Sequence, residues 1–170
     1  MVPLFVEKSL HLSPRWTGAG LFVWAAVEGV VLLTVGRHVD LRGRRPFLRA
    51  GAGLAVVAAL VLAFTTGPWQ FLLGMAVFGA ASGVLSTSSA AVVGDVIGGR
   101  GGTAVAGYQM SSDAGSSSGP LVAGRLSDLY SFQAAYLATA CVSGVAFVAA
   151  LLMPETRRVT VQPDAAVPER

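Results

Sequence analysis

The chain has 170 residues, of which 54% are hydrophobic and 12% are charged, and its mean hydropathy is +0.66. Because soluble domains carry about 25% charged residues, these values exclude an ordinary water-soluble globule and indicate an integral membrane protein. The net charge of +3 does not indicate nucleic-acid binding, because much of the basic charge lies in one polar break between apolar stretches. Basic residues at such a position favour contact with lipid headgroups. The break contains Arg37, Arg42, Arg44, Arg45 and Arg49.

Five stretches are long and apolar enough to cross a bilayer as helices, which takes roughly 20 residues each. In chain order they comprise residues 16–35, 47–66, 69–94, 102–124 and 132–153. The first contains Glu28 and the fourth contains Asp113, whereas the third and fifth contain no charge. Residues 1–6 resemble the last turns of a further helix whose body is missing. We therefore predict an all-α membrane protein, a multi-pass helical bundle with about five transmembrane helices over residues 1–158 and a short cytoplasmic tail over residues 159–170.

The distribution of basic residues predicts an orientation for this bundle. If residues 36–46 are cytoplasmic and the spans alternate, only Lys8, Arg15 and Arg125 fall outside, whereas the other basic residues fall inside: Arg37, Arg42, Arg44, Arg45, Arg49, Arg100, Arg157, Arg158 and Arg170. Such a bias sets topology in membrane proteins, and interfacial aromatic rings add to it. Trp16, Trp69 and Tyr130 then all lie at the outer interface. The prediction is a multi-pass protein of the plasma membrane with a cytoplasmic C-terminus.

The break between the first two spans contains a distinctive pattern, Gly36-x3-Asp40-x2-Gly43-Arg44-Arg45. Glycine permits the tight reversal that antiparallel spans require. Asp40 can accept hydrogen bonds from the N-terminus of a neighbouring helix, where the macrodipole favours an anion. The alternative is a generic basic loop that serves only to set topology.

Two more motifs follow the loop pattern in order. The fourth span contains Gly107 and a glycine–proline run formed by Gly115, Gly119, Pro120 and Gly124, and the fifth span is followed by Pro154-Glu-Thr-Arg157. Together the three motifs resemble the major facilitator superfamily of secondary transporters. There the loop pattern lies between helices two and three or eight and nine, the run lies in helix five or eleven, and the last motif follows helix six or twelve. Here Ala123 replaces one glycine of the run, and the leading glycine is one residue closer than usual.

The resemblance favours the C-terminal half of the family fold. The fourth helix of the N-terminal half typically carries an arginine before its glycines, and the corresponding stretch, Phe71 to Gly79, has none. The five spans are therefore similar to helices eight to twelve, and residues 1–6 to the end of helix seven. The chain is expected to be a fragment whose partner is the missing N-terminal half.

Ionisable groups in mid-membrane are functional candidates, and this chain has two, Glu28 and Asp113. Gln109, Ser112, Asp113 and Ser116 follow helical spacing and form one polar stripe. The stripe lines either a water-filled path or a buried polar seam between helices. Glu28 is either a protonatable relay group or the partner of an arginine at the inner surface.

Small and helix-breaking residues carry further expectations. On the third span, Gly79 and Gly83 are spaced for close helix contact, and Ser82, Ser86 and Ser89 share a face, where hydroxyls usually return to backbone carbonyls. Pro120 should kink the fourth span.

The residues contain no catalytic constellation, so the chain is not expected to be an enzyme or to bind a cofactor. His11 and His38 fall on opposite sides of the membrane and cannot share a metal, and Cys141 has no neighbouring base. The resemblance implies a carrier that moves a small solute across the lipid bilayer by rocking of two six-helix halves, of efflux type and coupled to protons. The alternative is a non-transporting multi-pass protein that acts in interaction or assembly. The missing sequence distinguishes the two hypotheses.

Overall fold

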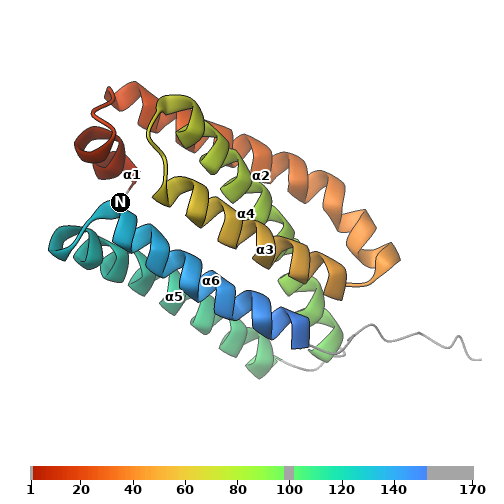
Figure 1. Ribbon diagram of the computed structural model, residues 1–170. Helices are drawn as coiled ribbons and strands as arrows, with labels where there is room; N and C mark the ends of the chain where they lie inside the picture. The colour runs from red at the N-terminus through yellow and green to blue at the C-terminus, as the bar shows by residue number, and fades with distance from the viewer. Residues whose placement is uncertain (1, 98–101, 153–170) are drawn as a thin grey trace, which may run out of the picture.

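The computed structural model of the protein describes residues 2–97 and 102–152, and within these ranges every regular element is a helix (Figure 1). The long helices are arranged as an up-and-down bundle. A short N-terminal segment lies at one end of it. In chain order the elements are α1 (Val2–Leu4), the π-helical turn η1 (Phe5–Ser9), α2 (Pro14–Arg42), α3 (Arg45–Ala63), α4 (Pro68–Ile97), α5 (Gly102–Leu129) and α6 (Phe132–Leu152).

Prolines mark the starts of three of the long helices. Pro14 opens α2, Pro46 lies in the first turn of α3 and Pro68 opens α4. The fixed φ of proline suits the first helical turn, and the missing N–H removes a donor that would have no partner there. Before α6, the Oγ of Ser131 accepts a hydrogen bond from the amide of Ala134 at 3.0 Å and supplies an N-terminal cap.

The turn between α2 and α3 lies later in the chain than the sequence predicted. The polar break from Gly36 was expected to be a loop, but α2 continues to Arg42 and only Gly43 and Arg44 separate it from α3. Gly43 adopts φ 87°, a left-handed conformation that a side chain would oppose, so the reversal occurs at this glycine and not at Gly36. The segment is helical because it contains no helix breaker before Gly43.

Helices α2, α3, α4 and α6 form the body of the bundle. Helix α4 packs along both α2 and α3, and α3 also packs along α6. Two glycines of α4 permit the close approach to α2, as their spacing predicted. A Cβ atom at Gly79 would collide with the carbonyl oxygen of Trp24, and one at Gly83 would lie 2.8 Å from Cγ1 of Val31. The absence of side chains at these two glycines therefore allows α4 and α2 to approach each other closely.

A cluster of buried hydrophobic side chains lies at the end of the bundle that holds the N-terminal segment. Phe5 of η1 inserts its ring among aromatic residues of α4 and α6, with ring centroids 5.0 Å from Tyr136, 5.7 Å from Phe132 and 6.4 Å from Phe71. These offset and edge-on arrangements are the ones aromatic pairs prefer. The N-terminal segment therefore belongs to the folded core.

The outer surface of the bundle is apolar. The side chains of Phe22 and Leu33 on α2 are 74% and 88% exposed, which is unfavourable in water and normal in contact with lipid. Four described helices are long and apolar enough to cross a bilayer, over Pro14–Val39, Arg45–Ala63, Pro68–Val93 and Phe132–Leu152. With its all-helical fold, the chain is a multi-pass membrane protein whose outer surface contacts lipid.

Helix α5 differs from the others. It has 28 residues, which is long enough for a bilayer, but its composition is more polar than that of the four apolar helices. It packs mainly against α6, at the edge of the bundle, and most of its residues are exposed (Figure 1). The helix continues through Pro120 to Leu129, and the kink at this residue stays a prediction.

Candidate functional site

The first candidate group is the carboxylate of Glu28, which lies between α2 and α4. Ser82 of α4 donates a hydrogen bond from Oγ to Oε1 of Glu28 at 2.8 Å, and both side chains are half-buried. Ser82 thus bonds to a side chain on another helix, not to the backbone carbonyl that the sequence analysis favoured. The recorded partner of Glu28 is a neutral hydroxyl, whereas one of the two hypotheses expected an arginine.

The second candidate group is the polar stripe of α5. Gln109 donates from Nε2 to Oδ1 of Asp113 at 3.3 Å, one helical turn apart, and Ser116 donates to the backbone carbonyl of Asp113 at 3.0 Å. Ser112 lies on the same stripe, and all four side chains are exposed in this chain. The stripe is therefore neither buried as a seam nor enclosed as a path by the described residues.

The structure does not bring the two acidic residues together. The recorded contacts of Glu28 reach α4, whereas the recorded side-chain contacts of Asp113 stay on α5. Helices α2 and α5 lie on opposite sides of the bundle, with α3, α4 and α6 between them (Figure 1). The described residues therefore do not form a single relay through both acids.

The glycine–proline run of α5 is open to the surroundings. A Cβ atom built at Gly115, Gly119 or Gly124 would meet no atom within 4 Å, and the same holds for Gly107, more than two turns before Gly115. The helix-packing glycines of α4 behave in the opposite way, because Gly79 contacts backbone. The run thus presents a surface of small residues that no described part of this chain covers.

The loop pattern is divided between a helix and a turn. Gly36 lies within α2, where a Cβ atom would lie 3.9 Å from Cγ2 of Thr87, so its small size is not required by close contact. Gly43 forms the reversal, Arg44 is the N-cap residue of α3, and Arg45 is the first residue of that helix. Asp40 lies in the last turn of α2, but its side chain lies outside the described part of the structure, as do residues 154–157 of the third motif and the tail.

Two arginines at the start of α3 form a contact that the sequence analysis missed. Arg49 donates from Nη2 to the carbonyl of Leu151 at 2.6 Å and from Nε to that of Ala150 at 3.3 Å, and Arg45 donates to Leu151 at 3.2 Å. These carbonyls end α6, where the macrodipole is negative and backbone acceptors have no helical partner. The pair therefore caps α6 and fixes the adjacent ends of α3 and α6.

A signal for this contact was present in the sequence. Basic residues in the first turns of a helix are unfavourable with respect to that helix's own dipole, which favours a contact of Arg45 and Arg49 with the C-terminus of another helix. Which helix C-terminus they reach depends on the packing of α3 against α6, and the chain order does not reveal it.

The described residues contain no group of three or more His, Cys, Asp or Glu side chains that could hold a metal ion. The thiol of Cys141 is exposed on the surface of α6.

A sequence model of the Major Facilitator Superfamily matches residues 1–169, which is nearly the whole chain. The chain belongs to this superfamily. It is similar to the multidrug resistance protein MdtG of Proteus mirabilis (strain HI4320), with 28% identity over an alignment of 158 residues that covers 88% of this chain. These residues cover 38% of that relative, so the chain spans about two fifths of the length of the curated protein it matches.

Proposed function

We propose that this chain is the C-terminal portion of a major facilitator transporter, with α2 to α6 as helices eight to twelve and the N-terminal segment as the end of helix seven. The observation that carries the proposal is the state of α5. It is a helix of membrane-spanning length whose polar stripe and glycine run are both exposed, beside four helices that are apolar enough to cross a bilayer. Polar residues within a membrane bundle face other helices or a water-filled cavity. The missing half of the transporter is the partner that would enclose them.

We propose further that the complete transporter exports small organic solutes in exchange for protons, across the plasma membrane. The similarity to a protein named for multidrug resistance supports export, as does the glycine–proline run that resembles antiporter members. Asp113 supports proton coupling, because it is the ionisable residue on the exposed stripe, hydrogen-bonded by a neutral amide instead of neutralised by a recorded cation. A carboxylate that is alternately hydrated and enclosed can bind and release a proton.

The test compares this chain alone with the complete transporter that contains it. Each is expressed to equal levels, and efflux of a fluorescent organic cation such as ethidium is measured in everted membrane vesicles with and without an imposed proton gradient. We expect gradient-dependent flux from the complete transporter and background flux from the chain alone, because substrate sites in such carriers lie between the two halves. Equal flux from both preparations would contradict the assignment of this chain to one half.

A binding measurement on the complete protein tests the interaction or assembly hypothesis. A complete protein that inserts, folds and binds none of a panel of organic cations, anions and neutral drugs in equilibrium dialysis would contradict export of organic solutes. Binding without gradient-dependent flux would contradict proton coupling while leaving the solute class intact.

A further inference from the structure

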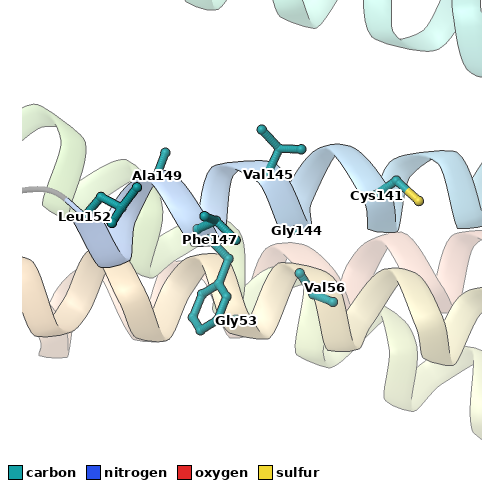
Figure 2. A pocket seen from close by; sticks show the side chains of 9 residues that line it. Gly53, Val56, Cys141, Gly144, Val145, Phe147, Ala149 and Leu152 are labelled. Carbon is teal, nitrogen blue, oxygen red and sulfur yellow. The ribbon is translucent and has the colours of Figure 1, made fainter.

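An open apolar groove of about 810 Å³ runs along the surface where α3 meets α6. Figure 2 shows its residues, with Gly53 and Val56 on α3 and side chains from Cys141 to Leu152 on α6. The ring of Phe147 covers Gly53, where a Cβ atom would lie 3.4 Å from Cε2. The volume falls within the range of about 300–1,000 Å³ that is typical of small-ligand sites. Both lining helices are membrane-spanning candidates, so the groove faces lipid chains.

The groove ends beside the arginine cap. Arg49 precedes Gly53 by four residues and Arg45 precedes it by eight, so both share the face of α3 that lines the groove. Their hydrogen bonds to Ala150 and Leu151 hold the two guanidinium groups next to Leu152, which lines the same end. Among the described residues, their recorded side-chain contacts are with neutral carbonyl oxygens. Two positive charges therefore lie at the mouth of an apolar groove. Each guanidinium group also has N–H donors that do not take part in the cap of α6.

The length of the groove matches one leaflet. From Cys141 to Leu152 the helix rises about 16 Å, which is about half of the roughly 30 Å hydrocarbon thickness of a bilayer. An acyl chain that starts at the arginine end would reach the bilayer centre near Cys141. In the predicted orientation the arginine end of the groove lies in the cytoplasmic leaflet, which is the leaflet rich in anionic lipid. Basic pockets between spans on that side bind acidic lipid headgroups.

We propose that the α3–α6 groove is a binding site for an anionic phospholipid, with its phosphate on Arg45 and Arg49 and one acyl chain over Gly53. A second copy of the chain fits the groove less well. Two parallel copies related by a two-fold axis would bring four arginines to the same end of the interface, and like charges oppose such a contact. The proposal does not depend on transport, since it concerns the outer surface of the bundle.

The test uses the full chain and two lipids with identical acyl chains, palmitoyl-oleoyl phosphatidylglycerol and palmitoyl-oleoyl phosphatidylcholine. The purified chain is mixed with each lipid in detergent, and bound lipid is counted by native mass spectrometry. The double variant R45Q/R49Q removes the charges, and R45K/R49K keeps them. Gly144→Leu fills the groove from α6, where a Cβ atom meets nothing within 4 Å. Gly29→Leu on α2, at an equally open position, is the matched control.

We expect the parent chain to bind one phosphatidylglycerol in preference to phosphatidylcholine. The charge-removing variant should lose about 30-fold in affinity for phosphatidylglycerol, the equivalent of about 1 kcal/mol for each arginine. The lysine variant should keep most of the preference, and Gly144→Leu should lose bound lipid of either kind while Gly29→Leu keeps it.

Three results would overturn the proposal. The first is equal binding of the two lipids by the parent chain. The second is unchanged lipid binding in Gly144→Leu, which keeps the proposal testable even if the charge-removing variant does not fold. The third is a dimer in the parent chain that Gly144→Leu converts to monomer, because a second copy would then occupy the groove.

Discussion

Asp113 occupies a different environment from Glu28, although both are acids within apolar helices. Glu28 is tied to a neighbouring helix through Ser82, whereas Asp113 is held by Gln109 on its own helix and is otherwise exposed. A carboxylate fixed between two packed helices is suited to structure, and one on an exposed face is suited to exchange with water. The two residues therefore serve different roles in our proposal.

Asp113→Asn should abolish the proton-gradient dependence of efflux by the complete transporter while leaving expression and thermal stability unchanged. Asparagine is nearly isosteric and its Oδ1 can still accept the hydrogen bond from Gln109, but it cannot carry a proton. The measurement is efflux from everted vesicles over a series of external pH values, with Ser112→Ala as the control on the same stripe. Retention of pH-driven efflux in Asp113→Asn would show that the carboxylate is structural.

Two sets of glycines in this chain have opposite surroundings, which permits a matched pair of variants. Gly79→Leu should destabilise the chain by about 1–3 kcal/mol, because its side chain would collide with the backbone at Trp24. Gly115→Leu should leave the stability of the chain alone within about 0.5 kcal/mol, because nothing lies within 4 Å of its Cβ position. Unfolding in mixed detergent, followed by circular dichroism, measures both.

The same pair distinguishes the chain from the complete transporter. Gly115→Leu should impair the complete transporter, whose other half would pack on the glycine run, although it spares the chain alone. If Gly115→Leu has no effect on stability or efflux in either context, the run does not form an interface between halves.

At the scale of the element, the arginine cap connects the start of α3 to the end of α6. Arg49→Met keeps much of the apolar stem but removes both hydrogen bonds to Ala150 and Leu151. We expect a loss of about 1–2 kcal/mol in the free energy of unfolding, because charged donors and the dipole of α6 both contribute. Arg49→Lys should lose less, since it keeps the charge without the planar fork. Faster hydrogen exchange in the last turn of α6 should accompany the loss, and its absence would argue against a capping role.

The existence of the helices was predictable from the sequence, whereas their ends were not. Apolar runs of 20 residues and more identify spans directly, because a bilayer sets their length. The sequence did not predict the continuation of α2 through His38, because polar and basic residues there indicated a loop. Such residues are compatible with a helix. Within this segment, only Gly43 adopts a left-handed conformation. A polarity change marks where a helix leaves the lipid, and a backbone breaker marks where it ends.

The contacts of the candidate residues were less predictable than the residues themselves. Periodicity placed Gln109 and Asp113 on one face of α5, and their hydrogen bond follows from spacing alone. The partner of Glu28 and the acceptors of Arg49 lie 54 and more than 100 positions away in the chain. Such contacts depend on which helices are neighbours, which periodicity within one helix does not specify.

For the whole molecule, the packing places chain segments at defined ends of the bundle. The rings of Trp16 and Trp69 are 5.9 Å apart, so the starts of α2 and α4 lie at the same end. The contact of Arg49 with Leu151 places the start of α3 and the end of α6 at a common end. These helices therefore alternate in direction along the chain, which is the arrangement that the predicted orientation assumes.

The orientation itself can be measured with reporters. A reporter fused after Arg158 should be cytoplasmic, and one inserted at Gly67 between α3 and α4 should be external, because most basic residues then lie inside. Alkaline phosphatase is active only outside and a fluorescent protein folds inside, so the two positions should give opposite results with each reporter. A cytoplasmic Gly67 would reverse the predicted orientation of the bundle.

The polarity of α5 also bears on how the chain is made. As a spanning helix, α5 would have to leave the translocation channel with Asp113 and several serines, and an aspartate at the centre of a span opposes partitioning into lipid by about 2.5–3.5 kcal/mol. Helix α6 follows after only Tyr130 and Ser131 and is free of charge. The two helices would therefore partition together as one hairpin, with the apolar α6 carrying α5 across. Helix α5 would therefore enter the lipid only after α6 has been synthesised, although α5 is synthesised first.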